Sequence, residues 1–218
     1  MVMRKNAMAK NLRQSILKSL GRYIAIVAII ALGASMFVGL LMTKSDMVAT
    51  GQVYLDEQNM FDLRLVSSYG WDLDQVEKIA QMDGVVDAEG VIYVDVISQL
   101  QWKEDESVLR FYALPETINK LSLRGGRMPM APDECVIDGY MGTEEMLGAT
   151  IQVSSSNSED TLEAMVYDTY TIVGFVATPL YMDMNRGTTS VGSGALETYL
   201  YIPTIKSVTT ISRAVFEP

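Results

Sequence analysis

The chain has 218 residues, among them 27 acidic and 17 basic side chains, one cysteine and no histidine. This composition lacks the usual zinc ligand sets and the histidine that activates a hydrolase nucleophile, so we expect no catalytic residue, no metal ligand and no enzyme. The net charge of −10 repels nucleic acid, so DNA or RNA binding is not expected.

The first segment, residues 1–22, is basic and contains no acidic side chain. Apolar residues recur on one helical face. They are Ala9, Leu12, Ile16, Leu17 and Leu20. This pattern predicts an amphipathic helix lying on the inner membrane surface, where its basic side attracts anionic lipid. A continuous helical extension into the cytoplasm is the alternative.

The next segment, residues 23–43, is uncharged and reads YIAIVAIIALGASMFVGLLMT. About 20 apolar helical residues cross the roughly 30 Å hydrocarbon layer, so this segment predicts a transmembrane helix. A secretory signal peptide is the alternative, but the run is long for one and no clear cleavage site follows. Basic flanks stay in the cytoplasm, which predicts a membrane protein with its N-terminus in the cytoplasm and its main domain outside.

Small side chains recur along the predicted span at three-, four- and seven-residue steps. They are Gly21, Ala25, Ala28, Ser35 and Gly39. Stripes of small residues let a second helix approach closely, so these residues are our candidates for helix packing.

Beyond the span, we expect a helical stalk over residues 44–59 and an extracytoplasmic domain over residues 60–218. Residues 45–218 carry 10 basic and 27 acidic side chains, a formal charge of −17. The single Cys135 cannot form an intrachain disulfide, and the apolar residues that follow it predict a small buried side chain.

The domain pattern predicts an α+β fold in which strands dominate. Asp72 is the expected N-cap of a short helix that ends near residues 83–84. Residues 85–100 indicate one long or two short strands, and residues 108–114 return as the second strand of a hairpin. The other strands are expected at residues 61–66, 134–137, 150–154, 162–167, 169–177 and 198–202.

Two loops and two pairs of potential calcium ligands remain. Residues 154–160 predict an exposed hairpin loop, and residues 179–194 predict either a binding loop or a locally mobile segment. Asp72 with Asp74, and Asp183 with Asn185, lack the full calcium-loop pattern, so solvated acidic turns are expected there.

The order of parts resembles the MacB/FtsX-like family of ABC transporter permeases. Residues 61–96, FDLRLVSSYGWDLDQVEKIAQMDGVVDAEGVIYVDV, are similar to the strand, short helix and long strand that begin the family's extracytoplasmic core domain. The most specific match is a "GR.P" turn at residues 126–129, which precedes acidic Glu134 and an apolar strand. Residues 147–153 and 170–182 are similar to the next two family elements.

This resemblance implies the N-terminal part of a permease subunit in the bacterial plasma membrane, beside a separate cytoplasmic ATPase that would bind the ATP. Export or release of amphiphiles and regulation of envelope proteins are both functions in the family. The remaining permease helices or a second permease copy, the lipid bilayer, and an extracytoplasmic peptide or protein are the other expected partners. Because the family has at least four spanning helices, we expect the sequence to be a fragment.

Two other hypotheses stay open. A single-pass sensor or adaptor would use the same anchor to hold an external binding domain. An anchored enzyme is the weaker hypothesis, because activated nucleophiles and metal ligands are missing from the sequence.

Overall fold

The computed structural model describes residues 8, 10–11, 13–15, 18–67, 70–206 and 212–217, the last of these by backbone only. The chain divides into two units, Met1–Val53 and Tyr54–Pro218, which are considered separately. Most of the apolar face predicted for residues 1–22, namely Ala9, Leu12, Ile16 and Leu17, lies outside the described residues.

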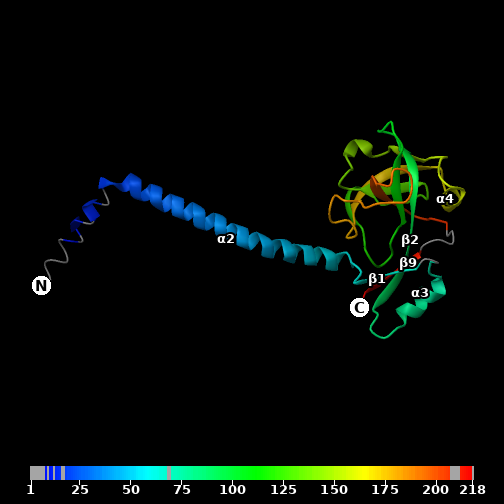
Figure 1. The fold of residues 1–218 in the computed structure, drawn as a ribbon, viewed down its shortest axis with the longest axis horizontal. Helices are drawn as coiled ribbons and strands as arrows, with labels where there is room; N and C mark the ends of the chain where they lie inside the picture. The colour runs from blue at the N-terminus through cyan, green and yellow to red at the C-terminus, as the bar shows by residue number, and fades with distance from the viewer. Residues whose placement is uncertain are drawn as a thin grey trace. The chain divides into compact units, whose positions relative to one another are not determined.

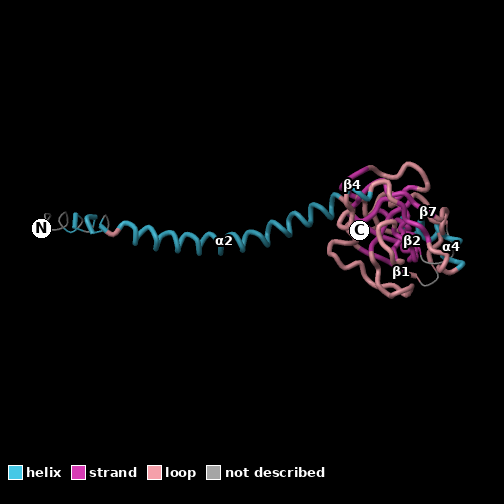
Figure 2. Tube along the Cα trace, turned by 90° about the horizontal axis from the view of Figure 1, so that it is seen from above, coloured by secondary structure: helices cyan, strands magenta, loops and turns pink. Residues whose placement is uncertain are grey.

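Helix α2, Leu20–Glu57, is one unbroken helix of 38 residues (Figure 2). Among the described helices it alone is long and apolar enough to cross a membrane, judged by length and composition. At 1.5 Å per residue it is about 57 Å long, which exceeds the hydrocarbon layer. The helical stretch that we expected after the apolar run is therefore present as far as Glu57.

The second unit is an α+β domain rich in strands, as predicted (Figure 1). Its helical elements are α3 (Leu73–Ala80), the short 3-10 helix η1 (Glu144–Met146) and α4 (Glu159–Ala164). Its strands are β1 (Leu63–Val66), β2 (Asp87–Leu100), β3 (Ser107–Ala113), β4 (Ser122–Gly126), β5 (Glu134–Asp138), β6 (Thr150–Val153), β7 (Thr169–Ala177), β8 (Thr198–Ile202) and β9 (Ser212–Glu217).

Within the described residues, six strands close into a barrel. The pairings run from β2 through β3, β8, β5, β7 and β6, and β6 pairs again with β2. Strand β4 pairs with the far end of β7. The first half of β2 leaves the barrel and pairs with β9, which in turn pairs with β1. Strand β2 thus links a barrel to a small three-stranded sheet.

Alternating side chains of the barrel strands enter two different cores. Leu109 and Phe111 of β3 point into the barrel, whereas Tyr112 lies in the second core on the outer face. Strand β8 does the same, with Leu200 inside and Tyr199 outside. These strands are buried on both faces, because successive side chains of a strand point to opposite sides.

Helix α3 begins where the sequence predicted. The Asp72 side chain accepts hydrogen bonds from the first turn, and Gln75 completes a capping box. Val76 and Ile79 face the small sheet and pack against Leu65 and Ala88 (Figure 1). The helix therefore covers the part of β2 that lies outside the barrel.

The predicted strands agree closely with β7 and β8, whose bounds are those expected, and Cys135 is fully buried. Most of the predicted segment, residues 87–100, forms one long strand, β2, which pairs with β3 as the expected antiparallel hairpin. Burial raises the pKa of the Cys135 thiol well above its ordinary value. This cysteine is thus an inert part of the barrel core.

The strand predicted at residues 162–167 is wrong, because Glu159–Ala164 forms helix α4. Ser158 caps this helix with its hydroxyl, and Glu159 and Asp160 occupy the first turn, where acidic side chains complement the helix dipole. The capping signal outweighed the short apolar run that had favoured a strand.

The loop predicted at residues 154–160 is exposed at five of its seven residues, but it is no hairpin loop, because helix α4 follows it rather than a strand. Asn157 is buried, and its side chain accepts a hydrogen bond from the Ile97 N–H and donates to the Ile97 carbonyl oxygen. This segment is therefore a fixed connection between β6 and α4 rather than a free loop.

Candidate functional site

The small-residue stripe lies on one face of helix α2. At about 100° per residue, Gly21, Ala25, Ala28, Ser35 and Gly39 fall within an arc of about 80°. A methyl group added at Gly21 or Gly39 would meet nothing within 4 Å in the described part of the chain. The face is open for a partner helix, and its packing role stays a prediction.

The chain leaves helix α2 through a fixed corner inside the second unit. Asn59 adopts the left-handed conformation, with φ of 53°, which is typical of a residue just after a helix. The carbonyl oxygens of Gln58 and Asn59 accept hydrogen bonds from the backbone N–H groups of Lys120 and Asn119, at 2.7 Å and 2.8 Å. The helix end is thereby fastened to the loop after β3.

That loop is itself held by Glu89 of β2. The Glu89 carboxylate accepts backbone N–H bonds from Glu116, Thr117 and Ile118 at 2.7–3.0 Å. Bonds to a charged acceptor are stronger than neutral ones, so the loop that receives the helix end is well fixed.

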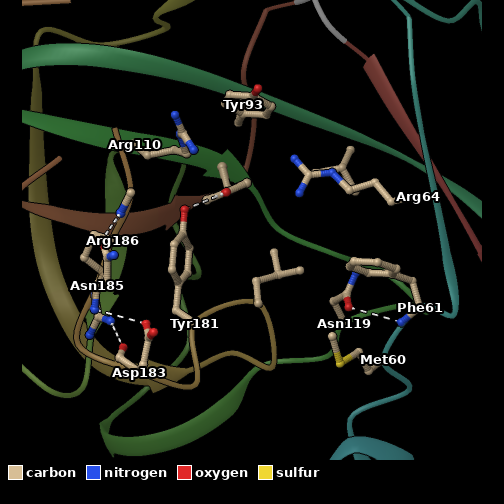
Figure 3. A pocket seen from close by; sticks show the side chains of 14 residues that line it. Met60, Phe61, Arg64, Tyr93, Arg110, Asn119, Tyr181, Asp183, Asn185 and Arg186 are labelled. Atoms are coloured by element: carbon tan, nitrogen blue, oxygen red, sulfur yellow. Dashed lines mark hydrogen bonds between the residues drawn. The ribbon is translucent and has the colours of Figure 1, made fainter. Parts of the chain in front are cut away.

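Beside this corner lies a cavity of about 370 Å³, which we call the tyrosine pocket (Figure 3). Fourteen residues line it, from the segment after α2, from β1, β2 and β3, from the loop after β3 and from the loop at residues 180–187. Its apolar wall includes Met60, Phe61, Val91, Leu180 and Tyr181. Its volume lies within the range of about 300–1,000 Å³ found for small-molecule sites.

Tyrosines form the base of the pocket. The Tyr112 and Tyr181 hydroxyls are 3.0 Å apart and share a hydrogen bond. The Tyr181 ring stacks on Tyr199 with centroids 4.6 Å apart, and Tyr112 stacks on Tyr201 at 5.1 Å. Burial raises the pKa of Tyr112, Tyr199 and Tyr201, so these phenols stay neutral.

Two of the three arginines at the pocket are paired with carboxylates. Arg110 makes a two-pronged bond to Asp95, at 2.6 Å and 2.7 Å, and lies 4.7 Å from the centre of the Tyr93 ring. Arg186 is buried and donates to Asp138 at 2.7 Å. Their charges are therefore compensated within the domain.

The third arginine, Arg64, lies on β1 and is exposed. It forms no ion pair with any residue that the structure describes. Figure 3 shows its guanidinium extending into the space between Phe61 and Tyr181. The pocket thus contains one cation whose charge is not compensated by an ion pair in the described part of the chain.

The loop at residues 179–194, predicted as either a binding loop or a mobile segment, lines the pocket through residues 180, 181, 183 and 185–187. It is anchored by Arg186, whose guanidinium lies 5.4 Å from the centre of the Tyr199 ring. The loop therefore forms one wall of the pocket. The sequence analysis did not predict the pocket. The signal that could have indicated it is the alternation of Tyr199 and Tyr201, whose rings stack on the pocket residues Tyr181 and Tyr112.

In both pairs that were considered as calcium ligands, an aspartate has a structural role. Asp72 caps helix α3, and Asp183 accepts the backbone N–H of Asn185 at 3.0 Å. Among the described residues, no group of three or more potential ligands could hold a metal ion.

Glu134 is hydrogen-bonded to the "GR.P" turn and to the two residues that follow it. It accepts hydrogen bonds from Arg127 and from the backbone N–H groups of Met130 and Ala131, and these bonds lower its pKa to about 2. The turn and the acidic residue at the start of β5 are thus in direct contact.

We therefore expect stability to depend on pH at Glu134. Because its pKa is lower in the folded state, the contribution of this carboxylate is fully present above its ordinary pKa of 4.5 and is lost as the pH falls towards 2. An NMR titration of the carboxyl carbon should give a midpoint near pH 2, and Arg127→Gln should raise it. A midpoint near 4.5 in the unsubstituted chain would contradict this contact.

No protein-family model matches the chain, and no curated protein matches it. Several solved structures do match. A domain assigned to a permease protein from Porphyromonas gingivalis has a TM-score of 0.39 and 14% identity, over 70% of this chain and 63% of that one. The chain thus spans less than two thirds of that domain.

Two further solved structures are similar at the same TM-score of 0.39. One is the extracellular domain of the noncanonic ABC-type transporter YknZ from Gram-positive bacteria, with 10% identity over 68% of this chain and 74% of that one. The other is the periplasmic region of MacB from Actinobacillus actinomycetemcomitans, with 11% identity over 73% and 76%.

Proposed function

We propose that the chain is the N-terminal part of a MacB/FtsX-like ABC permease subunit. In this proposal helix α2 crosses the plasma membrane, residues 1–22 stay in the cytoplasm, and the domain from Tyr54 onward lies outside. The basic residues before the span and their scarcity after it support this orientation. The sequence resemblance over residues 61–96 and 126–137 supports the choice of family.

The observation that carries the proposal is the continuity of helix α2 from Leu20 to Glu57. A span needs about 20 residues, and residues 44–57 add about 21 Å of helix beyond it. Gln58 and Asn59, which directly follow the helix, are hydrogen-bonded to the loop that Glu89 holds. In the proposed mechanism, a separate cytoplasmic ATPase moves the spanning helices, and the continuous helix transmits the movement to the external domain.

This function is mechanical and assigns no reactive side chain to the chain. ATP is bound by the partner subunit, and no other cofactor is proposed. Export or release of an amphiphile and control of an envelope protein both fit such coupling. A single-pass sensor is the second candidate, and the tyrosine pocket favours it because a sensor needs an external ligand site.

The test is to co-express the complete reading frame with any ATPase that is encoded beside it and to purify the tagged chain from membranes. Under the permease proposal the two proteins purify together and hydrolyse ATP. A chain that purifies alone, without ATPase activity, would instead favour the sensor.

The same purification tests the small-residue stripe. Gly39→Leu should lower recovery of the neighbouring helices and the ATPase on the order of tenfold, because a bulky side chain prevents close helix approach. Ala34→Leu is the matched control, since residue 34 lies about 140° around the helix from Gly39. Equal recovery of both variants would refute the packing role.

A further inference from the structure

The chemistry of the tyrosine pocket narrows the class of ligand that it can hold. One wall is apolar and includes Phe61, Leu180 and the Tyr181 ring. Buried phenols form the base, and the Tyr112 and Tyr181 hydroxyls already bond to one another. The wall and base therefore suit the apolar part of a ligand.

The polar end of the pocket is rich in arginine. Arg64, Arg110 and Arg186 line it, although residues 45–218 contain only 10 basic side chains against 27 acidic ones. Asp183 is the one acidic residue among the fourteen that line the cavity. Since Asp95 and Asp138 compensate the other two arginines, Arg64 is the cation available to a ligand.

A second observation points to the same kind of ligand group. Asn119 is 3% exposed and lines the pocket next to Phe61 (Figure 3). Its Oδ1 accepts the Phe61 N–H, but its Nδ2 is buried and has no acceptor among the described residues. A buried donor without a partner is costly, and an oxygen atom from a ligand would satisfy it.

We propose that the tyrosine pocket binds a small amphiphile that carries a single carboxylate or phosphate group. The oxyanion pairs with Arg64 and accepts a hydrogen bond from Asn119, while the apolar body lies against Phe61, Leu180 and Tyr181. A cationic ligand would be repelled by Arg64, and a wholly apolar one would leave both Arg64 and the Asn119 amide without a partner. The inference does not depend on the ATPase, because every residue of the pocket belongs to Tyr54–Pro218.

The pocket also adjoins the end of helix α2. Met60 and Phe61 follow the helix directly, and the Asn119 N–H bonds to the Asn59 carbonyl oxygen. A bound ligand would therefore contact the segment that connects the helix to the domain.

The experiment is isothermal titration calorimetry on the full chain in phosphatidylcholine nanodiscs, with empty nanodiscs as the blank. The probes are N-acetylphenylalanine and its neutral amide, which share a body and differ in charge. We expect the acid to bind at least tenfold more tightly, as for a charge-assisted bond. Decanoate carries the same group on an aliphatic chain, so the tighter of the two acids identifies a peptide-like or a lipid-like source. Equal affinity for acid and amide, or no binding of either acid, would overturn the proposal.

Variants test the two polar contacts. Arg64→Gln removes the cation. Asn119→Asp removes the amide donor, keeps an oxygen to accept the Phe61 N–H, and adds a negative charge that repels the oxyanion. Each should weaken binding of N-acetylphenylalanine about tenfold. Lys78→Gln on helix α3 removes an equally exposed charge outside the pocket and should change nothing. The comparison requires that Arg64→Gln keeps the thermal unfolding midpoint of the unsubstituted chain. If it then binds N-acetylphenylalanine as tightly as Lys78→Gln does, the oxyanion contact is refuted.

Discussion

Replacing Arg186 with methionine is expected to lower the free energy of unfolding by about 3–5 kcal/mol. The Arg186 and Asp138 side chains are only 6% and 2% exposed, so the substitution leaves a carboxylate buried without its cation. Asp138 would keep its bond from the Tyr140 N–H, but this neutral donor does not replace a guanidinium. Urea unfolding of the full chain, followed by tryptophan fluorescence, measures the change.

The control for this prediction is the exposed ion pair of Lys103 and Glu197. Each of these side chains is 36% exposed, and Lys103→Met should cost less than about 1 kcal/mol. The double variant Arg186→Met with Asp138→Asn should recover part of the loss, because the buried charge is gone. If Arg186→Met is no more destabilising than Lys103→Met, the buried pair does not form.

The same variant should also weaken probe binding in the tyrosine pocket. Arg186 holds the loop that carries Leu180 and Tyr181, and its guanidinium lies 5.7 Å from the centre of the Tyr181 ring. Without the ion pair, the loop loses its anchor to β5 and the pocket loses a wall.

Gly174→Ala is expected to destabilise the domain by about 1–3 kcal/mol or more, because the added carbon has no space. It would lie 2.3 Å from the carbonyl oxygen of Arg127 and 3.0 Å from that of Gly125, and both of these atoms belong to the backbone. Strands β4 and β7 can approach this closely only where a side chain is missing. The same unfolding assay measures the effect.

Gly90→Ala in β2 is the matched control. Its added carbon would meet only the Val76 side chain, at an ordinary contact distance of 3.7 Å. Since glycine weakens a strand by about 0.5–1 kcal/mol relative to alanine, this variant should stabilise the domain. The two substitutions should therefore act in opposite directions, and a shift of both in the same direction would contradict the close approach of β4 and β7.

Local signals in the sequence predicted much of the domain. Asp72 caps helix α3, and residues 169–177 and 198–202 are strands with the expected bounds, because turn residues delimit both apolar runs. Strand β4 was missed, since its sequence, SLRGG, has little strand propensity and is held by pairing with β7. Helix α4 was missed because its N-terminal capping signal was not weighed against the apolar run that follows.

The pocket could not be predicted in the same way. Arg64, Tyr93, Asn119 and Tyr181 are far apart in the sequence, and they meet because β1, β2 and two loops lie against one another. Arg186 is similar: nothing near it indicates that it pairs with Asp138, which is 48 residues away.

By itself, the sequence determined the apolar run within helix α2, the uneven distribution of charge along the chain and the α+β class of the domain. These properties depend on hydrophobicity, charge and periodicity, which act over a few neighbouring residues. The closed barrel, the second core of tyrosines and the pocket were decided by the tertiary structure. They depend on strand pairings between distant segments, such as β6 with both β2 and β7, whose register no local pattern encodes.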